Sequence, residues 1–186
     1  MGAKTASLDR GAYHVFDFCE PGKEQSDNIE KSVPVDPNAL PLALDVELGE
    51  SEAAANAYSL KQRRCLSMEG KASEQNKIRM ILQSVERHYG KKPIIFGSSE
   101  IFKSVIDETF RPYAIWLHQY NQQTGGASLA GENPWTFWQY TNVGRFSGSD
   151  KPVDLSVFFG PRERYNQFKQ SGFNYALAAA TGQVLK

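Results

Sequence analysis

Short apolar runs recur along the chain and alternate with segments of helical periodicity. Six such runs, of which the last is the weakest, cover residues 11–16, 41–46, 93–97, 114–117, 136–140 and 153–155. Unbroken apolar runs of this length are typical of strands that are covered on both faces. Their alternation with helical segments predicts an α/β fold built around a mostly parallel sheet.

The clearest helix is predicted at 73–89, because the apolar residues at 78, 81, 82, 85 and 89 form one stripe. Gly90 is suited to end this helix. Further helices are expected at 50–64, after an N-cap at Ser98 or Ser99, and between Pro161 and Gly172. Loops are expected at 121–134 and 144–151, while the Ala-rich tail 173–186 fits either a helix or a frayed end.

The composition indicates a folded protein without a strong electrostatic preference for a partner. The chain has 186 residues, of which 40% are hydrophobic and 12% aromatic, and we expect a single domain over 1–186. Lys+Arg and Asp+Glu both number 21, so neither nucleic acid nor an anionic membrane surface is an expected partner. No apolar stretch reaches the ~18 residues of a membrane span, and the N-terminus lacks the apolar segment of a signal peptide.

The two cysteines, Cys19 and Cys65, receive no chemical role from the sequence. Two residues are too few for a disulfide framework, and their spacing matches no metal-binding motif. We therefore expect two unpaired thiols.

The most informative motif is Asp45-Val46-Glu47, at the C-terminal end of an apolar run. In parallel α/β folds this end of the strands forms the reaction face. Residues two apart on a strand point the same way, so both carboxyl groups are expected in one pocket, where mutual repulsion raises the pKa of one of them. A neutral acid beside a charged one suits glycosidic bond cleavage, although a solvated loop or a metal ligand set remains an alternative.

A third acid, Asp154, lies between apolar residues and is expected near the same strand ends, unless it caps a turn before the Pro161 helix. Aromatic and amide side chains are concentrated around these runs, and such groups bind the apolar faces and the hydroxyl groups of sugars. About half of the aromatic residues are nevertheless expected in the core. The candidate substrate-binding residues are Tyr13, Phe16, Trp116, Tyr120, Trp138 and Gln139.

These motifs, in this order, resemble the family 25 lysozymes of the glycoside hydrolases. The matching segments, from about Gly11 to Phe159, are GAYHVF (11–16), LALDVE (42–47), IWL (115–117) with Tyr120, FWQYT (137–141), GRFSG (144–148) and VDLSVF (153–158). The resemblance implies a modified TIM-like (β/α) barrel of eight strands. It also implies hydrolysis of the β-1,4 bond between N-acetylmuramic acid and N-acetylglucosamine of bacterial peptidoglycan, with retention of configuration and without a metal or other cofactor.

By the matching positions, Glu47 would be the acid/base, and Asp45 and Asp154 would orient the substrate and stabilise positive charge. The nucleophile is left open between a protein carboxylate and the acetamido group of the substrate. The resemblance further implies a secreted, periplasmic or phage-encoded protein that is a monomer at full length.

The sequence departs from the family pattern in three places. Only ten residues precede Gly11, so the first two strands and one expected aspartate of the barrel are predicted to be absent, and 3–10 to be the end of a helix. Phe96-Gly97-Ser98 replaces a tyrosine-containing strand end, and His118-Gln119 replaces smaller residues before Tyr120. These changes affect expected substrate contacts but remove neither Asp45, Glu47 nor Asp154.

Two other functions are considered. A glycan-binding relative without activity would have no reason to accept the desolvation cost of clustered acids. A metal-dependent deacetylase or phosphoesterase would need histidines beside the acids. His88 is expected on the exposed or boundary part of a helix, and His14 is expected to be a satisfied core residue.

Overall fold

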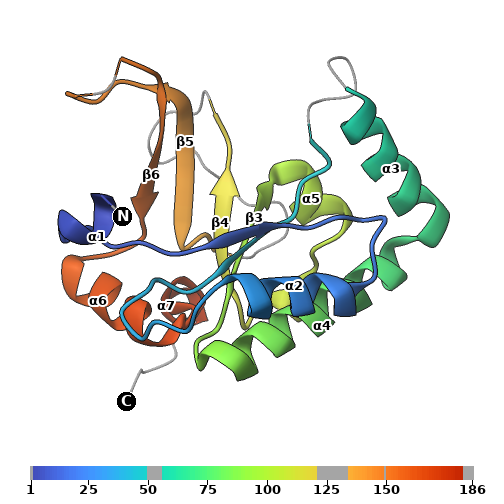
Figure 1. The fold of residues 1–186 in the computed structure, drawn as a ribbon, viewed down its shortest axis with the longest axis horizontal. Coiled ribbons are helices and arrows are strands. Elements are labelled where there is room, and N and C mark those ends of the chain that lie inside the picture. The colour runs from blue at the N-terminus through green and yellow to red at the C-terminus, as the bar shows by residue number, and fades with distance from the viewer. Residues whose placement is uncertain (1, 50–55, 121–133, 149, 182–186) are drawn as a thin grey trace.

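The computed structural model describes residues 2–49, 56–120, 134–148 and 150–181, and a mixed sheet forms its centre (Figure 1). The strands are β1 (Tyr13–Val15), β2 (Ala43–Asp45), β3 (Ile94–Ser98), β4 (Ala114–His118), β5 (Phe137–Gly144) and β6 (Val153–Phe158). The helices are α1 (Gly2–Thr5), α2 (Gly22–Ser32), α3 (Ala57–Glu69), α4 (Lys71–Tyr89), α5 (Ser99–Ser104), the 3-10 helix η2 (Glu108–Phe110), α6 (Arg162–Ser171) and α7 (Tyr175–Thr181).

The six strands lie in the sheet in chain order, from β1 to β6. Strands β1 to β5 are parallel neighbours, and β6 returns antiparallel to β5. Each predicted apolar run therefore contributes a strand, and the mixed α/β fold is confirmed. Among the described residues β1 and β6 are the two edges of the sheet, and closure into a barrel stays a prediction.

The main core lies between the sheet and helix α4. The predicted stripe of α4 is buried except for the partly buried Tyr89, with Ile78, Ile81 and Leu82 at 0% exposure. It packs with strand residues such as Leu44 and Ile95 in one apolar cluster. Loss of one such side chain to alanine costs about 2–5 kcal/mol. This packing fixes the sheet from which the candidate site projects.

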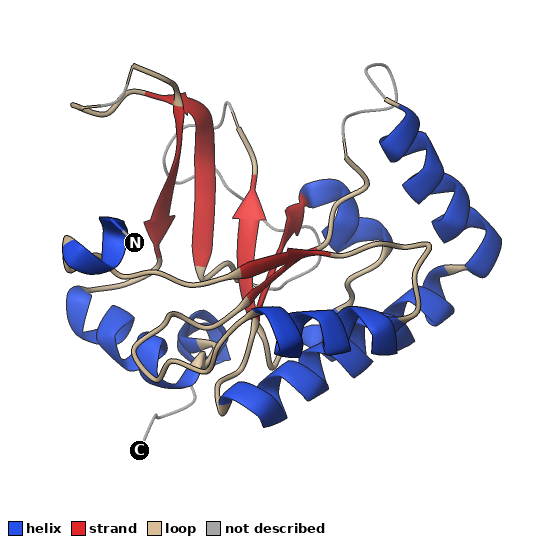
Figure 2. Ribbon diagram, viewed as in Figure 1, coloured by secondary structure: helices blue, strands red, loops and turns tan. Residues whose placement is uncertain are grey.

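Helix α2 was not predicted, and its sequence explains why. Within GKEQSDNIEKS the one large apolar residue is Ile29, so no apolar stripe marks the helix. Figure 2 shows α2 alongside α4, where Ile29 is buried. The buried Gln25 of α2 binds the carbonyl oxygens of Asp17 and Glu20 at 2.9 and 3.1 Å, so this helix is held largely by polar contacts.

The other helices differ from prediction mainly at their ends. Helix α3 begins at Ala57, where the Asn56 side chain accepts a hydrogen bond from the Ser59 N–H, and the predicted residues 50–55 lie outside the described part. Ser98 caps α5 as predicted, whereas Pro161 is the N-cap of α6 rather than part of its first turn. The tail forms α7 up to Thr181. None of the described helices combines the length and the apolar character needed to span a bilayer.

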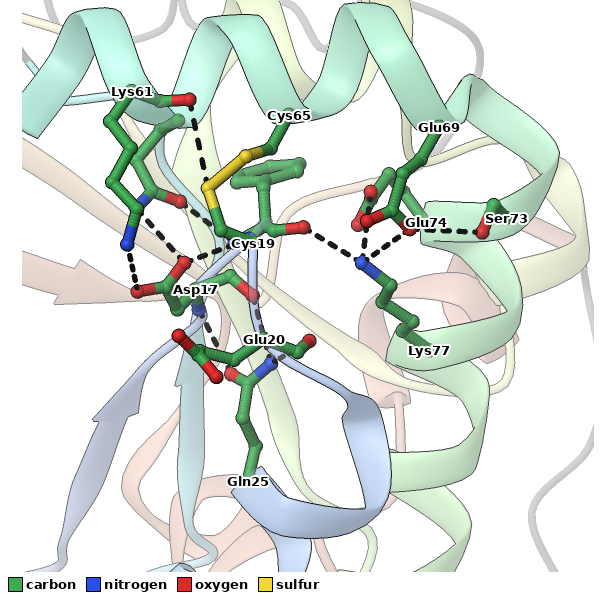
Figure 3. Close-up of polar contacts among 12 residues, drawn as sticks. Asp17, Cys19, Glu20, Gln25, Lys61, Cys65, Glu69, Ser73, Glu74 and Lys77 are labelled. Carbon is green, nitrogen blue, oxygen red and sulfur yellow. Dashed lines mark hydrogen bonds and ion pairs between the residues drawn. A yellow bond between two sulfur atoms is a disulfide. The ribbon is translucent and has the colours of Figure 1, made fainter.

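The expectation of two unpaired thiols was wrong, because Cys19 and Cys65 form a disulfide (Figure 3). Their Cα atoms lie 5.3 Å apart although 46 positions separate them in sequence. Sequence spacing could not reveal this pair, since tertiary packing of α3 against the segment after β1 brings the sulfur atoms together. Nearby, Gln62 of α3 accepts from the Phe18 N–H at 2.7 Å and donates to Asp17 Oδ1 at 3.0 Å.

A buried ion pair lies beside the disulfide. Lys77 Nζ contacts Glu74 Oε1 at 3.2 Å and Glu69 Oε2 at 2.7 Å, and it donates to the Phe18 carbonyl oxygen at 2.7 Å (Figure 3). The Glu74 side chain has 0% exposure, and burial raises its pKa. These contacts link α3, α4 and the segment after β1, so they fix the position of α3 against α4 and this segment.

Candidate active site

The site lies at the carboxyl ends of the parallel strands, because the sheet register aligns polar and aromatic side chains there. Asp45 of β2 pairs with Phe96 of β3, and Phe96 pairs with Trp116 of β4. Further along, His118 is the last residue of β4 and pairs with Gln139 of β5. Residues from all six strands, β1 to β6, contribute to the same face at this end of the sheet.

A cavity of about 630 Å³ opens at these strand ends. It is lined by all three acids of the sequence motifs, by four of the six candidate substrate-binding residues and by side chains from β3, β4 and β6. The lining residues are Tyr13, Ala43, Asp45, Glu47, Phe96, Trp116, His118, Tyr120, Gln139, Asp154 and Ser156. Asp45 and Glu47 therefore face the same space as Asp154, which is distant in sequence, and this space has a size that suits a sugar ligand.

Asp45 holds a proton to unusually high pH. Burial of its carboxyl group is the main cause, the negative charge of Glu47 adds to it, and His118 opposes it; together they raise the pKa of Asp45 to about 7. Asp45 Oδ1 is buried and has no hydrogen-bond partner among the described residues. An amide or hydroxyl group of a ligand could supply that missing donor.

Glu47 contacts His118, which the sequence patterns did not place in the site. His118 Nδ1 and Glu47 Oε1 form a short ion-pair contact, with side-chain exposures of 25% and 24%. The sequence held one indirect sign of this contact, because position 118 departs from the family pattern. In the structure His118 ends β4, which is two strands away from β2 in the sheet. Contact across two strands follows only once the strand order is known.

The aromatic lining is held by ring contacts and one hydrogen bond. Trp116 packs edge-on against Phe96, with ring centres 5.2 Å apart, and its indole N–H donates to Ser156 Oγ at 3.1 Å. Tyr120 stacks on His118 at 5.2 Å. Burial raises the pKa of Tyr120, and the charges of Asp154 and Glu47 add to this effect.

Two candidate substrate-binding residues, Phe16 and Trp138, do not line the cavity but lie in the core. Their exposed fractions are 0% and 2%. Phe16 packs edge-on against Phe18 at 4.8 Å, and the Trp138 indole N–H donates to the Gln119 carbonyl oxygen at 2.9 Å. The physical reason is alternation: Trp138 and the cavity-lining Gln139 are neighbours on β5, so their side chains leave opposite faces.

The remaining histidines have partners elsewhere. His14 Nε2 contacts Gln25 Oε1 at 3.1 Å, and His88 Nδ1 lies 3.6 Å from Glu30 Oε2. Within the part of the chain that the structure describes, no three His, Cys, Asp or Glu side chains are grouped so that they could hold a metal ion.

Comparison with known proteins points to one family. Residues 1–149 match the model of the family described as glycosyl hydrolases family 25. The uncharacterised protein YegX of Escherichia coli K12 is 28% identical over 162 residues, which cover 87% of this chain and 52% of YegX. The chain thus spans about half the length of the curated relatives it matches.

Solved structures give the same result. A family 25 glycosyl hydrolase from Bacillus anthracis is 30% identical, with a TM-score of 0.72 over 90% of this chain and 71% of that one. A bacterial lysozyme from Streptomyces coelicolor is 21% identical, with a TM-score of 0.71 over 90% of this chain and 75% of that one. The second likeness concerns the fold alone.

Proposed function

Because the chain belongs to family 25 of the glycosyl hydrolases, we propose that it cleaves the β-1,4 bond between N-acetylmuramic acid and N-acetylglucosamine in bacterial peptidoglycan. The observation that carries the proposal is the cavity in which Asp45, Glu47 and Asp154 face aromatic and amide side chains. Carboxyl groups supply the proton transfer and the charge stabilisation that glycoside hydrolysis needs. Aromatic rings and amides supply contacts for sugar rings.

Glu47 is the acid/base of this mechanism. In the first step its proton passes to the glycosidic oxygen while the bond from that oxygen to the anomeric carbon breaks. In the second step Glu47 accepts a proton from the water that attacks the anomeric carbon. General acid–base catalysis of this kind contributes about 10²–10⁴-fold in rate.

Asp45 orients the acetamido group of the substrate. Its buried Oδ1 has no partner among the described residues, so it offers an acceptor for the acetamido N–H. An acceptor oxygen that polarises this amide helps the amide oxygen to attack the anomeric carbon, and attack from within the substrate followed by water gives retention. Asp154 of β6 also lines the cavity, where it stabilises positive charge on the sugar ring.

The pH dependence follows from the shared acid pair. Asp45 lies beside Glu47 in the cavity, and burial together with the negative charge of Glu47 raises the pKa of Asp45 to about 7, so Asp45 keeps a proton up to about neutral pH. Passed on to Glu47, this proton replaces the one that Glu47 delivers to the glycosidic oxygen in the first step. The rate is therefore expected to fall as the pH rises above about 7.

Wall lysis together with product analysis tests the proposal. Clearing of bacterial walls by the wild type should be lost in Glu47→Gln, while Glu163→Gln, an exposed substitution on α6, should clear normally. Borohydride reduction of the products should label muramic acid, because that sugar becomes the new reducing end. Equal clearing by wild type and Glu47→Gln, or label on glucosamine alone, would overturn it.

Two further measurements distinguish this proposal from the two other functions considered, a glycan-binding protein and a metal-dependent hydrolase. Binding of walls with no new reducing ends would favour a glycan-binding relative. A strong loss of rate in EDTA would favour a metal-dependent hydrolase, whereas the carboxylate mechanism predicts an unchanged rate.

The proposed substrate lies outside the cytoplasm of bacteria, and the disulfide supports this setting. Bonds such as Cys19–Cys65 form and persist in oxidising compartments, including the periplasm and the extracellular space. We therefore propose a periplasmic, secreted or phage-released site of action.

A further inference from the structure

His118 is held firmly at the edge of the cavity, next to the proposed acid/base. Its ring is stacked on Tyr120 with an interplanar angle of 10°, and it lies 5.6 Å from the ring of Phe96. Because β4 ends at His118 and pairs there with β3 and β5, its backbone is fixed as well. The ring therefore has a defined orientation, with Nδ1 toward Glu47 Oε1.

We propose that His118 is a positioning residue for Glu47 that holds its carboxylate in place and stabilises its anionic form during turnover. This inference rests on the proposed function, since it assigns a partner to the acid/base of that reaction. The carboxylate of Glu47 forms no other ion pair among the described residues. Its orientation toward the glycosidic oxygen consequently depends on His118.

The contact between His118 and Glu47 matters because the other charged groups that line the cavity are acidic. The titratable groups that line it are Tyr13 of β1, Asp45 of β2, Glu47, His118 of β4, Tyr120 and Asp154 of β6. Tyr58 of α3 also interacts electrostatically with Asp45. Among the described lining residues, His118 alone can carry a positive charge, and it faces three carboxyl groups.

This charge balance predicts a role in both halves of the reaction. When Glu47 gives its proton to the leaving oxygen, it becomes an anion beside two other acids, and the imidazole whose Nδ1 contacts Oε1 opposes this accumulation of negative charge. Glu47 later regains a proton from the attacking water. No proton is lost from the pair overall, so His118 acts through Glu47 and need not touch the substrate.

Steady-state kinetics of His118→Gln against pH test the proposal on wall fragments, with His88→Gln as the matched control. His88 contacts Glu30 on the far helices α2 and α4, so His88→Gln should behave as wild type. His118→Gln should lower kcat roughly tenfold, which is below the range for a general acid–base itself because His118 acts only through Glu47, with little change in KM. Because His118 lowers the pKa of Asp45, its loss should also move the alkaline limb of the rate profile to higher pH by about one unit.

A purely structural role for His118 predicts a different result. The melting temperature would then fall, while kcat and the pH profile of the folded fraction would match those of the wild type. That outcome would overturn the proposal.

A measurement that needs no activity separates this inference from the proposed function. A slowly exchanging imidazole N–H proton, shifted downfield in the NMR spectrum, is expected in the wild type and should disappear in His118→Gln and move in Glu47→Gln. If the signal behaves so but walls are not cleaved, the proposed function fails and the contact stands. If the wild type lacks the signal although it cleaves walls, the His118 proposal fails alone.

Discussion

Trp116 on β4 and Ser156 on β6 are joined across the intervening strand β5 by a 3.1 Å hydrogen bond from the indole N–H to the hydroxyl oxygen. Both residues line the cavity, so the bond fixes an aromatic surface relative to the antiparallel edge of the sheet. Asp154, two residues before Ser156 on β6, has its side chain on the same face.

Ser156→Ala should loosen the Trp116 ring and weaken sugar binding. Because the bond is partly exposed, its loss should cost only about 0.5–1.5 kcal/mol of stability. We expect KM for wall fragments to rise severalfold while kcat changes little, measured by steady-state kinetics. Ser104→Ala, on the exposed end of α5, is the matched control. A fall in kcat with unchanged KM would contradict a binding role.

The disulfide should contribute substantially to stability. The bond joins residues 46 positions apart, and for a loop of that size the chain-entropy relation gives about 4 kcal/mol. Reduction of the wild type should lower the midpoint of urea unfolding, and Cys19→Ser/Cys65→Ser should show the lower value with or without reductant. Equal midpoints for the oxidised and reduced wild type would show that packing of α3 alone holds this region.

The sequence predicted the strands better than the helices, and the reason is physical. A strand covered on both faces leaves an unbroken apolar run, as at Ile94 and Ile95, whatever surrounds it. A helix leaves a pattern only when it buries an apolar stripe, as α4 does. Helix α2 buries Gln25 and Ser26 with a single isoleucine and so left no pattern.

The site was predictable as far as local rules extend. The positions of Asp45 and Glu47 follow from the end of a parallel strand, and that of Asp154 from a neighbouring apolar run. The contacts of His118 with Glu47 and of Cys19 with Cys65 depend on which strands and helices become neighbours. Phe16 and Trp138 were predicted to bind substrate because they are aromatic and close to the site in sequence. Each lies in the core instead, because the face of the sheet toward which a side chain points determines whether it enters the core or the cavity.

Asp45 should make stability depend on pH. Its pKa is about 7 in the folded protein and 3.8 in its ordinary state, so between these values the folded state binds the extra proton. The free energy of unfolding should therefore fall as the pH rises through this window, and the loss should be complete above about 7.

Asp45→Asn, which stays neutral, should remove much of this slope. At pH 8 we expect it to be more stable than the wild type by on the order of 2 kcal/mol, after allowance for solvent screening. Urea unfolding at pH 5 and pH 8 measures the difference, with the exposed Asp27→Asn on α2 as control. The same slope in wild type and Asp45→Asn would place the pH dependence in another group.

Glu74 and Lys77 provide the last prediction, because removing one partner should cost more than removing both. Lys77→Met would leave the Glu74 carboxyl, with 0% exposure, without its cation, and a buried unpaired charge costs about 3–5 kcal/mol. Lys77 also donates to the Phe18 carbonyl oxygen, so part of the loss would come from that bond.

Adding Glu74→Gln to Lys77→Met should recover a large part of the stability, since the remaining amide is neutral. Urea unfolding of the two single variants and the double variant completes the cycle. If the double variant were no more stable than Lys77→Met, loss of the bond to Phe18, rather than the charge on Glu74, would account for the lower stability of Lys77→Met.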